Sequence, residues 1–256
     1  MTRDKTLFKL YAAEFLGTAL FITLGISLVI MIWGTGSPVP HMITSVPMRK
    51  IITGFLVGFI SSLIALSPVG KISGAHTNPA VSFAFWRSGK MKTYALFGYV
   101  VSQMLGALVG ALPLLLWDKR GSSIKYGSTV PGAFGLLPAF LGELVITAIF
   151  VSLVLIFTGS KKMRGYTPFI SPFFYGFMVW AEGALSGCSA NPARSFGPAM
   201  ISGNYGDYWI YLVAPIAAAI LVGFLFNVLH IQRLLPIEAA RISHHDCYSP
   251  DCLKTN

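Results

Sequence analysis

The stretch Ser73–Phe83 reads SGAHTNPAVSF, and the stretch Ser186–Phe196 reads SGCSANPARSF. Ser-Gly, Asn-Pro-Ala and Ser-Phe stand at the same offsets in both copies. Internal repetition in a membrane protein indicates two half-molecules that build one site between them. We therefore expect the site between two tripeptides, Asn78-Pro79-Ala80 and Asn191-Pro192-Ala193.

The composition places the chain in a membrane. Of its 256 residues, 54% are hydrophobic and only 11% are charged, whereas soluble domains carry roughly a quarter charged residues. Six apolar stretches approach the roughly 20 residues that cross a bilayer as helix: Phe8–Trp33, Arg49–Ser67, Thr93–Leu116, Phe134–Thr158, Thr167–Leu185 and Tyr208–His230. Nothing remains for a soluble domain, so residues 1–256 are predicted to form a single transmembrane, all-α domain.

The repeat extends into the first and fourth spans. Glu14 and Thr18 recur as Glu143 and Thr147, and each pair lies on one helix face. A carboxyl inside a span needs a partner, so we expect both pairs to brace the carbonyls of the repeated loops. Each half has three spans, an odd number, so the repeat must be inverted. The first repeat is predicted at about 8–117, the second at about 134–231, and a cytoplasmic tail at 232–256.

Both tripeptides fall outside the spans and have the sequence of a helix start. Asn is a favoured N-cap and Pro is favoured at the first helical position. The stretches that follow, Val81–Trp86 and Ser195–Ile201, are too short to cross a bilayer. We predict two re-entrant half-helices, beginning at Pro79 and Pro192, that enter from opposite faces and meet near the midplane. The Ser-Gly segments before them should offer free carbonyls to a pore.

The net charge of +10 follows the positive-inside rule. Of the 19 Lys and Arg residues, only six lie on the far side when the N-terminus is cytoplasmic: Arg49, Lys50, Lys119, Arg120, Lys125 and Arg194. Both termini are therefore predicted to be cytoplasmic, and nucleic acid is not an expected partner. Cys247 and Cys252 near His244 and His245 could bind a metal, but their spacing is common. We expect a loosely ordered tail, no metal and no cofactor.

Taken together, these motifs resemble the aquaporin, or major intrinsic protein, family. The resemblance runs from about Phe8 to about Leu235 and includes Gln103 in the third span and Pro215 in the sixth. It implies six helices plus two half-helices, one pore per subunit, a homotetramer in a cell or plasma membrane, and passive flow. It also implies that Gln103 supports the structure together with the two glutamates. At position 195 the chain resembles the water-channel branch of the family, because it has Ser195 where glycerol facilitators typically have Asp.

The resemblance further implies an outer constriction built around Arg194. By family spacing, Val179 stands where strict water channels have His, and Cys188 forms another wall. The fourth wall is either Gly58 or Val57, depending on whether Pro68 adds a residue. This constriction is expected to be wide and apolar, so water and other small neutral solutes should pass: ammonia, urea, hydrogen peroxide, carbon dioxide or glycerol. If the spacing is off, Val179 is a packing residue.

Glu182 follows Val179 by three residues. Two interpretations stay open for it: a vestibule residue near Arg194, or a solvated carboxylate at a helix end. For the whole chain, the competing function is a coupled secondary transporter, which would use Glu14 and Glu143 as ion sites. No nucleophile motif or phosphate loop is present in the sequence, so an enzyme is not expected.

Overall fold

The computed structural model describes residues 3–160 and 162–229. Within these residues the protein is helical and has no strand. The long helices are α1 (Arg3–Trp33), α3 (Val46–Leu66), α6 (Thr93–Ala111), α8 (Leu136–Gly159), α9 (Ile170–Ala181) and α11 (Tyr208–Val228). The predicted tail, with Cys247 and Cys252, lies outside the described residues.

Five helical segments are long and apolar enough to cross a membrane. The fifth predicted span differs, because its α-helix, α9, has only 12 residues. A 3₁₀ helix, η3 (Arg164–Phe169), precedes it and contains Pro168. Proline has no N–H and clashes with the preceding turn, which explains why the α-helix begins only after it. The third span likewise continues beyond α6 as a 3₁₀ helix, η1 (Leu112–Trp117).

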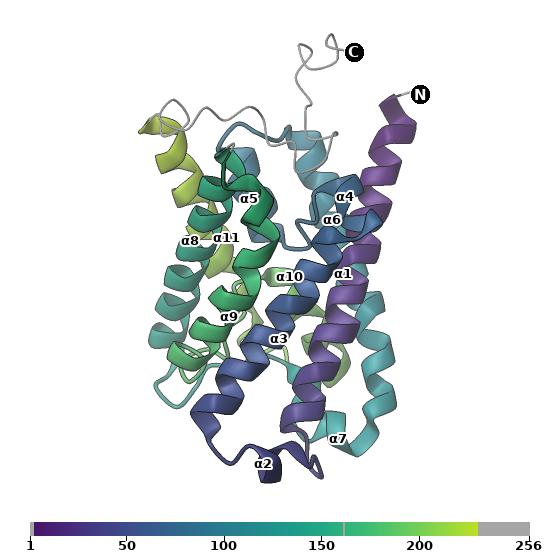
Figure 1. The fold of residues 1–256 in the computed structure, drawn as a ribbon, viewed down its shortest axis with the longest axis vertical. Coiled ribbons are helices and arrows are strands. Elements are labelled where there is room, and N and C mark those ends of the chain that lie inside the picture. The colour runs from purple at the N-terminus through teal and green to yellow at the C-terminus, as the bar shows by residue number, and fades with distance from the viewer. Residues whose placement is uncertain (1–2, 161, 230–256) are drawn as a thin grey trace.

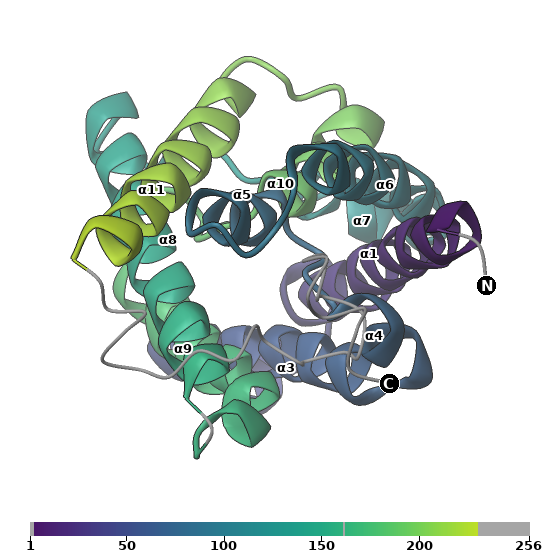
Figure 2. The same cartoon turned by 90° about the horizontal axis from the view of Figure 1, so that it is seen from above.

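The two half-helices lie inside the ring of long helices. They are α5 (Pro79–Arg87) and α10 (Pro192–Ser202), and Figure 2 shows both surrounded by the other helices. In Figure 1, α1 begins and α11 ends at the same end of the molecule, here called the inner end. The short helices α2 (Val39–Met42) and α7 (Asp118–Ser122) lie at the opposite, outer end. The structure thus has six spanning segments and two re-entrant half-helices, as predicted.

Glycines allow α3 and α9 to pack closely. A Cβ atom on Gly54 would overlap the Tyr175 carbonyl, and one on Gly58 would overlap the Ser171 carbonyl. Small residues that let helix backbones approach are typical of membrane interfaces, where van der Waals packing drives association. The Gly54–Gly58 face is therefore used inside the bundle.

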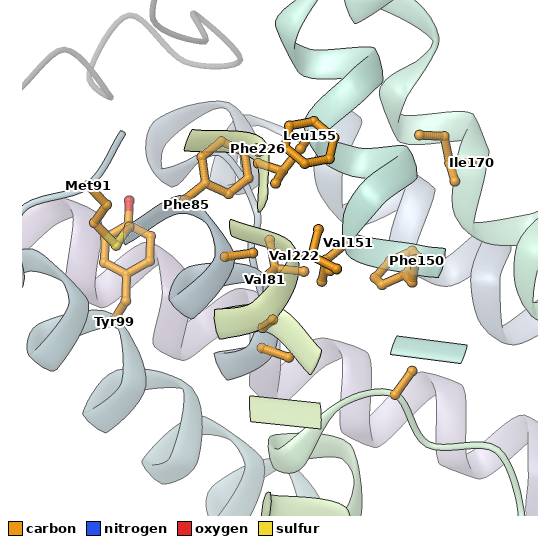
Figure 3. Close-up of a cluster of buried hydrophobic side chains, with 14 of the residues drawn as sticks. Val81, Phe85, Met91, Tyr99, Phe150, Val151, Leu155, Ile170, Val222 and Phe226 are labelled. Atoms are coloured by element: carbon orange, nitrogen blue, oxygen red, sulfur yellow. The ribbon is translucent and has the colours of Figure 1, made fainter. Parts of the chain in front are cut away.

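The buried core joins the two halves of the chain around α5. Figure 3 shows Val81 and Phe85 of this half-helix beside Val151 of α8 and Val222 and Phe226 of α11. All five side chains are buried. The first half-helix is therefore fixed mainly by contacts with the second half of the chain.

Candidate pore at the junction of the half-helices

The two Asn side chains cap their own helices and reach across to the opposite loop. Asn78 Oδ1 accepts from the backbone N–H of Ala80 at 2.8 Å, and Asn191 Oδ1 accepts from that of Ala193 at 3.0 Å. The Nδ2 of Asn78 donates to the carbonyl of Ala190 at 2.9 Å, and that of Asn191 donates to the carbonyl of Thr77 at 3.0 Å. Each half-helix start is therefore tied to the other.

The loops before the half-helices share an unusual backbone. Ala75 and Thr77 have φ values of 51° and 44°, and the equivalent residues Cys188 and Ala190 have 57° and 50°. Left-handed conformations of non-glycine residues cost roughly 1–3 kcal/mol each and persist only where the surroundings hold them. The same strained pattern in both loops requires matching supports on both sides.

Glu14 supplies the support on the first side. Its Oε1 accepts from the backbone N–H of His76 at 2.9 Å, and its Oε2 accepts from that of Thr77 at 2.8 Å. The expectation that the glutamates brace loop carbonyls is therefore wrong. A carboxylate accepts hydrogen bonds, so Glu14 holds the loop through its backbone N–H groups. The expected hydroxyl contribution is also not seen, since neither the Thr18 nor the Thr147 hydroxyl has a hydrogen-bond partner in the described part of the chain.

Glu143 makes the equivalent bonds on the second side. Its Oε1 accepts from the Ser189 N–H at 2.7 Å, and its Oε2 accepts from the Ala190 N–H at 2.8 Å. Each carboxylate also has a further side-chain donor. Gln103 Nε2 lies 2.7 Å from the Oε2 of Glu14, whereas the Ser186 hydroxyl donates to Glu143 Oε1 at 2.6 Å.

Two buried tyrosines complete the supports and were not predicted from the sequence. The Tyr99 hydroxyl donates to the Ser73 carbonyl at 2.7 Å, and the Tyr211 hydroxyl donates to the Ser186 carbonyl at 2.7 Å. They stand at matching places in the third and sixth spans, four residues before Gln103 and Pro215. Comparing the third spans of the two repeats residue by residue would have revealed this pair.

The predicted constriction residues meet at a cavity of about 240 Å³ at the outer end. Val57, Val179, Cys188 and Arg194 all line it. Of the two alternatives in α3, Val57 faces this cavity, while Gly58 packs against the α9 backbone.

Arg194 is held by a loop that the sequence did not single out. Its Nη1 donates to the Gly127 carbonyl at 2.7 Å, and Gly127 ends the 3₁₀ helix η2 (Lys125–Gly127). Nearby, the Ser195 hydroxyl is 2.6 Å from the Thr129 hydroxyl and 2.7 Å from the Ser189 hydroxyl. Ser195 is buried, so it joins this outer loop to the half-helix rather than facing a solute.

Glu182 fits neither of the two interpretations. It does not line the outer cavity, and it is buried rather than solvated. A Cβ atom on Gly142 would overlap its carboxylate, so Glu182 packs against α8. Its groove between α8 and α9 is apolar, with Leu141 and Val145 among the lining residues.

Comparison with known proteins agrees with this geometry. The model of the family described as "Major intrinsic protein" matches residues 1–226. Aquaporin-8 of Mus musculus is 33% identical over 84% of this chain and 80% of its own length, and the probable aquaporin TIP2-2 of Arabidopsis thaliana is 30% identical over 89% and 90%. The X-ray structure of the aquaglyceroporin from Plasmodium falciparum superposes with a TM-score of 0.70 at 23% identity, covering 90% of this chain and 99% of that one.

An inverted repeat whose two capped half-helices meet inside a helical ring defines a membrane channel. The chain belongs to the major intrinsic protein family. It is accordingly an integral membrane protein and a passive channel for water and small neutral solutes, not an enzyme.

Proposed function

We propose that the outer cavity is the selectivity filter and that it admits water together with other small neutral solutes, ammonia among them. The observation that carries this proposal is the pair of valines, Val57 and Val179, that line the same cavity as Arg194. Valine offers no hydrogen bond and leaves more room than His or Phe. The width of the outer cavity alone would also admit hydrogen peroxide, carbon dioxide, urea and glycerol.

The half-helices supply the barrier to ions. Each N-terminus carries roughly half a positive charge, and the two meet at Asn78 and Asn191, so cations are repelled. Each Asn amide has two N–H donors and one carbonyl oxygen. One donor is bonded to the opposite loop and the oxygen is bonded to its own helix. The remaining N–H of each amide is left to donate to a passing water, and a water that accepts from both Asn residues is a poor link in a proton wire.

Charge and topology support an orientation with both termini in the cytoplasm of a plasma membrane. Arg49, Lys50, Lys119 and Arg120 belong to the outer end, while most basic residues fall on the other side. We further propose a homotetramer, in which the exposed apolar faces of the long helices contact other copies or lipid. The division into repeats at about 8–117 and 134–231 belongs to the same proposal.

A coupled transporter is the weaker alternative. Its ion sites would have to be Glu14 and Glu143, yet both carboxylates are fully buried and each holds two backbone amides of its own loop. Such carboxylates act as structural acceptors, and releasing them would free strained loops.

Stopped-flow measurements on proteoliposomes with Val179→His test the filter. The substitution adds volume and a donor to the outer cavity, so ammonia flux should fall by a larger factor than water flux. Val179→Ile, which keeps the wall apolar, serves as the control. Equal ratios of ammonia to water flux in the wild type and Val179→His would overturn the filter assignment.

A further inference from the structure

A second, smaller cavity lies on the inner side of the half-helix junction. Its volume is about 70 Å³, compared with about 240 Å³ for the outer cavity. The inner cavity is therefore large enough for small solutes but much narrower than the outer one. Its walls include Ala75, His76, Val81, Phe85, Phe150 and Thr167.

Aromatic contacts fix the inner cavity from both repeats. His76 stacks on Phe85 with ring centroids 4.8 Å apart. On the facing side, Phe150 of α8 lies 4.8 Å from Phe174 and 5.5 Å from Tyr175 of α9. In Figure 3, Phe85 and Phe150 come from separate helices of the same buried cluster. Rings that are packed on several sides in a dense interior do not yield to a passing solute.

Polar groups are sparse beside this cavity, and two of them lack partners. The Nδ1 of His76 is 3.0 Å from the Ser82 hydroxyl. Its Nε2, and the Oγ1 of Thr167, are buried without a hydrogen-bond partner among the described residues. An unsatisfied buried polar atom costs about 1–3 kcal/mol, so a small hydrogen-bonding solute that enters beside them is stabilised. A bulky solute is blocked by the packed aromatic rings.

We propose that Phe150, facing the His76–Phe85 pair, sets the upper size limit of the solutes that this channel conducts. The inference rests on the proposed function and divides selection between two places. The outer cavity selects solutes by charge and polarity, at Arg194 and Val179. The inner cavity selects solutes by size, so water and ammonia pass while urea and three-carbon polyols are held back.

The test compares Phe150→Ala and Phe150→Leu with the wild type in proteoliposomes, measuring water, ammonia, urea and glycerol in parallel. Phe97→Ala is the matched control, because the side chain of Phe97 in α6 is 67% exposed and lies outside both cavities. Glycerol and urea flux per unit of water flux should rise about tenfold in Phe150→Ala, which corresponds to a barrier lowered by about 1.4 kcal/mol. Phe150→Leu should be intermediate and Phe97→Ala unchanged.

A gain of flux cannot come from misfolding, because misfolded protein lowers the flux of every solute. If Phe150→Ala also loses water flux, the ratio of glycerol or urea flux to water flux is read from Phe150→Leu instead, because leucine fills more of the site. The inference is overturned if water flux persists and neither variant raises the ratio of glycerol or urea to water. A wild type that conducts no water at all would instead overturn the proposed function.

Discussion

The Nδ2 of Asn78 lies 2.9 Å from the carbonyl of Ala190, the residue immediately before Asn191. Together with the reciprocal bond from Asn191 to Thr77 at 3.0 Å, this contact fixes both half-helix starts against each other. It also sets the direction of the free amide N–H groups. The pore centre is therefore one cross-linked unit.

Removing a carboxylate support should destabilise the protein. In Glu14→Gln, the amide keeps one acceptor oxygen but turns an NH₂ group toward the N–H of His76 or Thr77. We expect a loss of about 1–3 kcal/mol, the cost of one unsatisfied buried donor, seen as a lower Tm in detergent. Glu143→Gln should behave alike. Asp207→Asn is the control, because the Asp207 side chain does not cap α11, and an equal drop in its Tm would contradict the assignment.

The two tyrosines should be equivalent. Tyr99→Phe and Tyr211→Phe each remove one hydroxyl that donates to a loop carbonyl at 2.7 Å. A neutral hydrogen bond contributes about 0.5–1.5 kcal/mol, so both variants should lose that amount in thermal unfolding, with water flux retained. A clear effect of one substitution and none of the other would show that the repeat symmetry does not extend to these supports.

The sequence predicted the half-helices well because their signal is local. Asn followed by Pro determines a cap and a first turn, and the observed helices begin at Pro79 and Pro192. Local sequence could not show whether Val57 or Gly58 lines the constriction. The answer depends on the break after Leu66, where α3 ends and a separate short helix, α4 (Pro68–Ser73), begins.

Individual hydrogen bonds between distant parts of the chain could not be predicted. The bond from Arg194 to Gly127 joins α10 to a loop 67 residues away, and no motif marks that loop. The role of the glutamates was partly missed for a different reason. A buried carboxylate in a span shows that a partner exists, but whether the partner is an amide or a carbonyl depends on how the loop turns.

Replacing Ser195 should not convert the channel into a glycerol facilitator. Because its hydroxyl is buried between Thr129 and Ser189, Ser195→Asp places a carboxylate against two hydroxyls away from the outer cavity. We expect a lower Tm and an unchanged ratio of glycerol to water flux, and Ser195→Ala should cost less. A selective rise in glycerol flux for Ser195→Asp would show that this position faces the solute.

Mercurial reagents should block the channel through Cys188. This residue lines the outer cavity beside Arg194, so an adduct on its sulfur would fill the constriction. Water flux should fall in the wild type, recover on adding a thiol, and stay unaffected in Cys188→Ser. Undiminished block of Cys188→Ser would place the reactive thiol elsewhere, at Cys247 or Cys252.

The central claim is a passive channel that conducts neutral solutes and rejects charge. Stopped-flow light scattering of proteoliposomes, with a pH-sensitive dye inside, measures water, ammonia and proton flux in one preparation. The account predicts water and ammonia fluxes that do not saturate, and proton flux no higher than in empty liposomes. Solute flux that saturates and requires a proton gradient would contradict it.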